Sequence, residues 1–176
     1  MPTYKTDYDQ LFCNMSKKYR LKKLLLKSVA ICESALDARA YRFEPAFWSR
    51  YLKNNPEWKD RDMNEVSASY GLFQLMYTTA HQMGWRGSGE DLYNPVYNAE
   101  LGAKFIRMLL DKVAENGLSV KFWWLSPIEI SLARYNGGRT GNPDSEGKLR
   151  RKVYSDKVLR VWTDLKKKEK ECDDSA

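Results

Sequence analysis

Apolar residues that recur at three- and four-residue steps constrain the fold of this chain more than any other feature of its sequence. The clearest run begins near Ser16 and carries lysines on its opposite face, which is the pattern of an amphipathic helix. Strand-like patterns are confined to short pieces around residues 64–70, so we expect a mainly α fold with a minor β component (α+β). The predicted inward positions of the first helix are Leu21, Leu24, Leu25, Ser28, Ile31, Cys32 and Ala35.

Asparagine, proline and glycine mark the bounds of the later helices. Asn94 is a candidate N-cap with Pro95 at the first helical position. The helix that follows is expected to reach about Asn116, where Gly117 ends it. Further helices are expected over residues 45–51, 71–83, 127–135 and 148–168.

The chain has 176 residues, which is enough for one domain with a substantial core. We divide it into an N-terminal arm (1–16), a single helical domain (17–165) and a charged C-terminal tail (166–176). Its first residues are polar where a signal peptide would be apolar, so we expect synthesis in a cytoplasm without a signal peptide. The apolar run before Cys32 is short and contains Lys27, so no stable membrane insertion is expected.

Charge and cysteine content narrow the classes of partner and cofactor. The formal net charge is +7, which favours anionic partners such as nucleic acid, membrane surfaces or acidic polymers. No nucleic-acid-binding motif accompanies this charge, so nucleic acid is not the expected partner. The three cysteines fit no metal motif, and His81 is the only histidine. No metal or other cofactor is therefore expected.

Glu33 is the first candidate for chemistry, because it follows the apolar residues of the first helix in the stretch VAICES. A carboxyl group held against apolar surface has a raised pKa, since desolvation disfavours its charged form. Such a group can stay protonated near neutral pH and donate a proton to a leaving oxygen. The alternative is an exposed glutamate at the edge of the helix, which is the usual situation of an arbitrary Glu.

Two further stretches combine polar side chains with glycines. In SASYGLFQLM, Gln74 lies among apolar neighbours, and its amide must be satisfied either by the core or by a ligand in a cleft. In LARYNGG, Tyr135 and Asn136 end a helix in front of two glycines. Tyr135 offers a ring face and a hydroxyl to a sugar, while the alternative is an ordinary helix end.

Taken together, four stretches of the chain resemble the ordered motifs of the lytic transglycosylase and goose-type lysozyme superfamily. The resemblance covers roughly residues 20–165 and implies a lysozyme-like fold with a cleft that holds peptidoglycan glycan strands. The four stretches are ES at 33–34, SYGLFQLM at 69–76, DLYNPVYNAELGAKFI at 91–106 and ARYNGG at 133–138.

The resemblance assigns roles to individual residues. It implies that Glu33 is the catalytic acid and base. Phe73 stands where the family usually has Met, and Tyr77 where it often has Pro. The long stretch between residues 33 and 69 is similar to members found in bacterial viruses and is expected to form one wall of the cleft. The residues implied to line the site and contact the substrate are Ser69, Tyr70, Gly71, Leu72, Gln74, Tyr135 and Asn136.

The same resemblance implies cleavage of the β-1,4 bond between N-acetylmuramic acid and N-acetylglucosamine, with a 1,6-anhydro ring as the product. One carboxyl group suffices for this reaction. A hydrolytic muramidase would need a second carboxylate to activate water, and Glu65 and Glu44 are the candidates. Each could equally be an ion-pair partner of a nearby arginine (Arg39, Arg42 or Arg61). We favour that structural role for Glu44, leave Glu65 open, and place the transglycosylase outcome slightly ahead.

The expected partner is the peptidoglycan glycan strand, and the arm and tail are candidate docking segments for bacteriophage particle or tail proteins. A wall-degrading enzyme without a signal peptide fits a bacteriophage lysin or a virion-associated enzyme. The non-enzymatic alternative is a glycan-binding component of a phage tail that keeps the fold without the activity.

Overall fold

The computed structural model of the chain describes residues 8–121, 124–138, 142–144, 148 and 151–173. Its longer helices are α1 (Asp9–Tyr19), α2 (Lys23–Ser34), α6 (Pro95–Glu115), α8 (Pro127–Gly137) and α9 (Lys152–Asp173). The shorter ones are α3 (Pro45–Phe47), η1 (Trp48–Leu52), α4 (Met63–Val66), α5 (Tyr77–Gln82), η2 (Glu90–Tyr93) and α7 (Leu118–Lys121). The strands are β1 (Tyr41–Phe43), β2 (Ala68–Tyr70) and β3 (Leu75–Met76).

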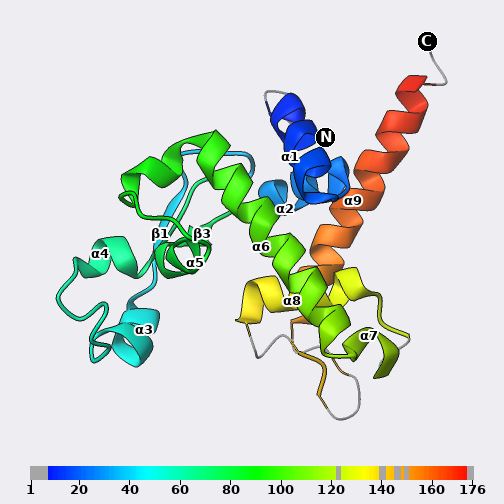
Figure 1. Ribbon diagram of the computed structural model, residues 1–176. Helices are drawn as coiled ribbons and strands as arrows, with labels where there is room; N and C mark the ends of the chain where they lie inside the picture. Colours follow the sequence, from blue (N-terminus) through cyan, green and yellow to red (C-terminus); the bar gives the residue numbers. More distant parts are fainter. Residues whose placement is uncertain (1–7, 122–123, 139–141, 145–147, 149–150, 174–176) are drawn as a thin grey trace.

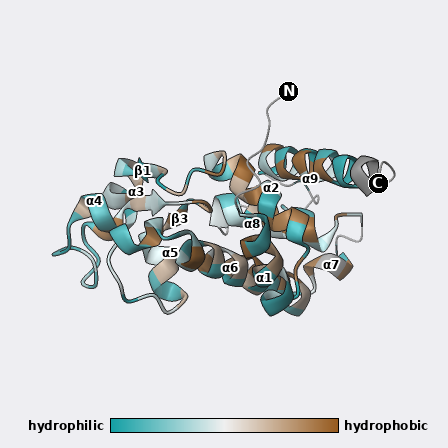
Figure 2. Ribbon diagram, turned by 90° about the horizontal axis from the view of Figure 1, so that it is seen from above, coloured by the Kyte–Doolittle hydropathy of each residue, from teal (hydrophilic) through white to brown (hydrophobic). Residues whose placement is uncertain are grey.

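Helix α6 runs between two parts of the molecule (Figure 1). One part holds the small sheet with α3, α4 and α5, and the other holds α1, α2, α8 and α9. Figure 2 shows the same separation from above. The sheet is antiparallel with the order β1-β2-β3, and Tyr70 pairs with both Tyr41 and Leu75. The expected mainly α fold with a small β component is confirmed.

Local sequence signals set the starts of α6 and α8, which begin at Pro95 and Pro127 as expected. The Asn94 side chain caps α6 by accepting from the Val96 N–H, with Pro95 at the first helical position. Ser126 and Glu129 form a reciprocal capping box at the start of α8. Both helices are therefore specified by residues within one turn of their N-termini.

One core joins the two parts around the middle of α6. Phe12 of α1 and Phe73 are both fully buried, and their rings meet edge to face with centroids 6.1 Å apart. Gly102 of α6 lies under the Phe73 ring, where a Cβ atom would come within 2.4 Å of ring carbon Cγ. The glycine in ELGAKF therefore allows the ring to pack directly on the helix.

The expectation of an irregular arm over residues 1–16 is wrong for residues 9–16, which belong to α1. The single helix expected from Ser16 is instead two helices, separated at Arg20, which has a left-handed conformation (φ 52°). Tyr8 at the N-cap makes no side-chain capping bond, so α1 lacks the capping signal that marks the starts of α6 and α8. The Asp9–Lys27 ion pair (2.5 Å) and the buried Phe12 hold α1 against the domain.

The helix expected over residues 71–83 is wrong over residues 71–76, which form a tight turn followed by β3. Gly71 and Gln74 both have positive φ angles (69° and 43°), which a helix cannot contain. Asn98 of α6, which is fully buried, holds this turn from outside. Its Oδ1 accepts from the Phe73 N–H (2.8 Å), and its Nδ2 donates to the Tyr70 carbonyl (2.8 Å).

The last helix extends beyond its expected end at residue 168, and therefore also beyond the expected domain boundary at residue 165. Helix α9 reaches Asp173, and Glu169 forms an ion pair with Lys23 of α2 (2.7 Å). The described part of the predicted tail is therefore helical and tied to the domain. No helix among the described residues combines the length and the apolar character that crossing a membrane requires.

Candidate active site

Glu33 lies in the last turn of α2, where the chain leaves the helix for β1. Ala35 and Leu36 follow it, both in left-handed conformations (φ 54° and 65°). The Ala35 N–H donates to the Ile31 carbonyl (3.0 Å), which satisfies one main-chain group at the helix end. This sharp end fixes the main chain two residues after Glu33.

The Glu33 carboxyl group is partly buried and has an aromatic hydroxyl as a hydrogen-bond partner. The Tyr154 hydroxyl of α9 donates to its Oε1 atom at 2.5 Å. Burial raises the pKa of Glu33, while the Tyr154 hydrogen bond and the positive charges of Arg42 and Lys157 only partly oppose that rise. The raised pKa expected from the VAICES stretch is confirmed.

A second tyrosine connects this site to the turn before β3. Tyr135 of α8 lies parallel to Tyr154, with ring centroids 6.4 Å apart. Its hydroxyl donates to the Phe73 carbonyl at 2.6 Å. Burial and the negative charge of Glu33 raise the pKa of Tyr135 well above its ordinary value. These contacts bring the ends of α2 and α8, the start of α9 and the turn before β3 into one site.

A direct contact also joins the end of α2 to the same turn. The Ser34 hydroxyl donates to the Leu72 carbonyl at 2.9 Å. The Leu72 side chain is fully buried, so this residue contributes its main chain to the site. Three of the four resembling stretches are thus brought together beside the end of α2.

The protein itself satisfies the Gln74 amide. The amide nitrogen donates to the carbonyls of Ala40 (3.0 Å) and Gly71 (3.2 Å), and Oε1 accepts from the Ser69 hydroxyl (3.1 Å). Of the two alternatives posed by the sequence, the core therefore supplies the partners. Gln74 holds the tight turn against the segment that leads into β1.

The other residues expected to contact a substrate divide into buried and exposed ones. Ser69 and Tyr70 are 1 % and 4 % exposed, and the Tyr70 hydroxyl donates to the Glu65 carbonyl (3.0 Å). Their side chains, like that of Leu72, do not reach the surface. They therefore pack beneath the site and hold its main chain in place. Asn136, in contrast, is exposed in the last turn of α8.

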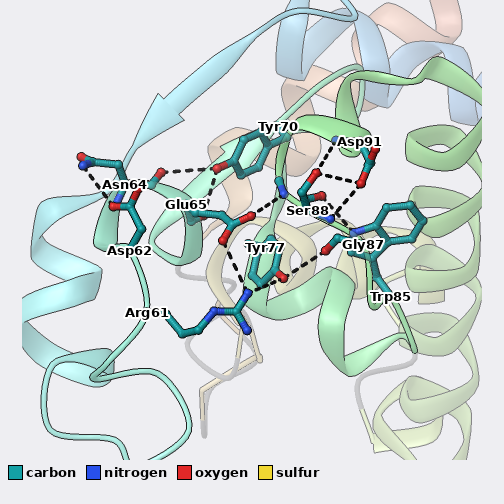
Figure 3. A network of polar contacts seen from close by, with 11 residues as sticks. Arg61, Asp62, Asn64, Glu65, Tyr70, Tyr77, Trp85, Gly87, Ser88 and Asp91 are labelled. Carbon is teal, nitrogen blue, oxygen red and sulfur yellow. Dashed lines mark hydrogen bonds and ion pairs between the residues drawn. The ribbon is translucent and has the colours of Figure 1, made fainter.

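Glu65 belongs to a polar network that fixes the loop in front of η2 (Figure 3). Its Oε1 accepts from the Gly89 N–H (2.7 Å), and its Oε2 pairs with Arg61 Nη2 (3.4 Å). Arg61 also donates to the Tyr77 hydroxyl (3.0 Å), which donates to the Gly87 carbonyl (3.1 Å). Both carboxylate oxygens are therefore engaged in the scaffold of the loop.

Glu44 forms the ion pair that the sequence favoured. Its Oε1 lies 2.6 Å from Arg42 Nε on β1. Because the charge of Arg42 also lowers the pKa of Glu33, one guanidinium group acts on both acids. Within the described residues, no group of three or more His, Cys, Asp or Glu side chains is arranged to hold a metal ion.

Sequence reasoning missed the two residues that organise this site from a distance. Tyr154 is separated from Glu33 by 121 positions, and Asn98 from Phe73 by 25. One signal for Tyr154 was present, because it lies four residues before the buried Val158 and therefore on the same face of the last helix. Asn98 was part of the resembling stretch at 91–106, but nothing local distinguished it from a surface asparagine.

Comparison with known families agrees with this geometry. The chain matches the family model described as the transglycosylase SLT domain over residues 10–155. This match spans most of the chain, so the protein belongs to the transglycosylase SLT family, and the resemblance drawn from the four stretches is confirmed. Members of this family are peptidoglycan lytic transglycosylases, and the chain is an enzyme of that class. A comparison with curated proteins gave no match.

Proposed function

We propose that Glu33 is the general acid and base of this transglycosylase. The observation that carries the proposal is the partly buried carboxyl group with a raised pKa, held by the Tyr154 hydroxyl beside the turn at residues 72–73 and the end of α8. A raised pKa enlarges the protonated fraction of the carboxyl group at any given pH, and a general acid must be protonated to act.

The proposed reaction cleaves the β-1,4 bond between N-acetylmuramic acid and N-acetylglucosamine. Glu33 gives its proton to the bridging oxygen, and positive charge develops at the muramic acid C1 and ring oxygen as the bond breaks. The Glu33 carboxylate then takes the proton from the C6 hydroxyl of the same sugar while O6 bonds to C1. The product is a 1,6-anhydro ring, no water is consumed, and Glu33 ends protonated.

The hydrolytic alternative requires a carboxylate that activates water on the other side of the bond. Glu65 and Glu44 were the sequence candidates, and each is engaged in an ion pair. Glu65 also accepts a main-chain hydrogen bond. This engagement favours the anhydro product over hydrolysis.

Mass spectrometry of digested sacculi tests the proposed reaction. We expect 1,6-anhydro muramic acid ends from the wild-type enzyme, and the same products from a Glu65→Gln variant. Reducing muramic acid ends would show that water is the acceptor and would overturn the transglycosylase mechanism. If Glu65→Gln then abolished their formation, Glu65 would be the missing second carboxylate.

Tyr154 is expected to lower the pKa of the proposed acid and to hold its carboxyl group in position. Its hydrogen bond stabilises the Glu33 carboxylate, so Tyr154→Phe raises the pKa of Glu33 further. The rate falls as pH rises through that pKa, and the alkaline limb of the kcat/KM profile should therefore move to higher pH. We also expect a loss of about 10- to 100-fold at the optimum, because the carboxyl group is no longer positioned.

The matched control for this experiment is Tyr41→Phe, which removes a hydroxyl that donates to the Asn64 carbonyl (2.8 Å). The control should leave the alkaline limb in place. A limb that stays fixed in Tyr154→Phe, or moves to lower pH, would contradict the proposed link between this hydroxyl and the acid.

We further propose that the enzyme acts as a bacteriophage lysin or as a virion-associated enzyme that opens the wall. The support is the long segment between residues 34 and 68, which is similar to members found in bacterial viruses and forms β1, α3, η1 and α4 in this chain. Co-purification with intact virions would favour the particle-borne role, and release only at lysis would favour the lysin.

A further inference from the structure

A hollow of about 700 Å³ lies between the segment that follows α2 and the start of α6. We call it the α2–α6 hollow. Its walls come from Tyr8 ahead of α1, residues 35–39 after α2, and part of the stretch from η2 to the first turn of α6. The lining residues of that stretch are Glu90, Asp91, Tyr93, Asn94, Pro95 and Tyr97. Glu33 is not among its lining residues, so the hollow is distinct from the candidate active site. Its volume falls in the range of small-molecule sites, about 300–1,000 Å³.

Aromatic rings form part of the wall. Tyr97 is 46 % exposed, and its ring leans on Trp85 with centroids 5.3 Å apart. Tyr93 is covered by the Arg39 guanidinium, 5.5 Å from its ring centroid. Tyr97 therefore offers an exposed and supported ring for stacking against a flat, partly apolar ligand.

Polar groups of both signs surround these rings. Asp37 and Arg39 come from the segment after α2, and Glu90 comes from η2, so two acidic residues and one arginine line the hollow. The Asn94 side chain uses its oxygen to cap α6, which leaves its amide N–H groups as donors. A cation would meet Arg39 and an anion would meet the acids, whereas a neutral ligand rich in hydroxyl and amide groups can use donors and acceptors alike.

Small apolar side chains also line the α2–α6 hollow. Ala35 is exposed and Ala38 is partly exposed in the segment after α2, and Pro95 is partly exposed at the start of α6. They offer contacts for a methyl group beside the polar rim. An N-acetylated amino sugar has a ring face that can stack on a tyrosine, hydroxyl and amide groups, and an acetyl methyl group. The hollow offers a partner for each of them: a supported ring, mixed donors and acceptors, and small apolar contacts.

We propose that the α2–α6 hollow is a second glycan-binding site, which holds N-acetylated amino sugar residues outside the candidate active site. The ligand class rests on the proposed function, since that function brings the enzyme to the peptidoglycan strand. The wall at residues 35–39 begins two positions after Glu33, so a strand held here stays close to the enzyme between cleavage events.

The test uses the full-length Glu33→Gln protein, labelled with ¹⁵N and titrated with the tetrasaccharide of N-acetylglucosamine. We expect saturable shifts of the Glu90, Asp91 and Tyr97 amides, in addition to shifts around residue 33. Tyr97→Ala in the same background should weaken binding at the hollow by about tenfold and leave the shifts around residue 33 unchanged. Tyr51→Ala, which removes another exposed tyrosine (56 %) outside the hollow, is the matched control.

Activity provides a second readout. Tyr97→Ala in the otherwise wild-type enzyme should raise KM on intact sacculi several-fold and leave cleavage of short soluble fragments unchanged. If the hollow amides do not move while residues around position 33 do, the second site is refuted and the proposed function stands. If neither region shifts, the second site is refuted, and whether the wild-type enzyme cleaves sacculi decides the proposed function separately.

Discussion

Glu33→Gln is expected to lower the rate of peptidoglycan cleavage by about 10²- to 10⁴-fold, which is the range that a general acid or base contributes. Glutamine keeps the shape of the side chain and can still accept the Tyr154 hydrogen bond through Oε1. It cannot donate and recover a proton in the way the reaction requires. The change therefore removes the chemistry with little disturbance of the fold.

The same substitution should stabilise the protein at neutral and higher pH. A carboxyl group whose pKa is raised by folding binds more protons in the folded state than in the unfolded state. Stability therefore falls as pH rises from the unfolded pKa of about 4.3 through the folded pKa. Glutamine carries no such penalty, so the melting temperature of Glu33→Gln should exceed that of the wild type at pH 8 and approach it near pH 4.

Two measurements check this prediction: release of soluble fragments from sacculi, and thermal unfolding at both pH values. Glu65→Gln is the matched control, because that carboxylate accepts from the Gly89 N–H and pairs with Arg61. The control should lose stability and keep activity. If Glu33→Gln retains wall cleavage within tenfold of the wild type, Glu33 is not the acid and the proposed mechanism fails.

The parts of the fold that the sequence predicted are those specified within one turn of chain. Asn94 and Pro95 set the start of α6 from adjacent positions. Helix α1 lacked such a start signal, and its place depends on the ion pair between Asp9 and Lys27. The turn at residues 71–74 looked helical because its apolar spacing is helical, but the distant Asn98 determines its conformation.

The candidate site shows the same division between local and distant information. Glu33 could be identified because its apolar neighbours are adjacent in the sequence, and burial is the main cause of its raised pKa. The role of Gln74 could not be decided, since its partner Ala40 is 34 positions away. The role of Tyr154 depends on the packing of α9 against α2, and no local motif in the chain predicts that packing. The residues that carry chemistry were thus easier to predict than those that position them.

Asn98→Ala is expected to destabilise the protein by about 3–5 kcal/mol, because it removes one side chain that serves three main-chain groups. The Phe73 N–H loses its acceptor, and the Tyr70 and Leu92 carbonyls lose their donor (2.8 Å and 3.0 Å). Each group is buried with Asn98, which is itself fully buried, and an unsatisfied buried group costs about 1–3 kcal/mol. For a chain of this length, the melting temperature should fall by roughly 10 °C.

Asn98→Ala should also disturb the candidate site, and lower its activity, at temperatures where the protein remains folded. Phe73 supplies the carbonyl that accepts from Tyr135 (2.6 Å), so a loosened turn moves both residues relative to Glu33. Thermal unfolding and cleavage of sacculi at 20 °C measure the two effects. The control is Asn116→Ala, which changes an exposed asparagine at the other end of α6. It should change stability by less than about 0.5 kcal/mol. A melting temperature for Asn98→Ala equal to that of Asn116→Ala would show that the turn holds its positive φ angles without Asn98.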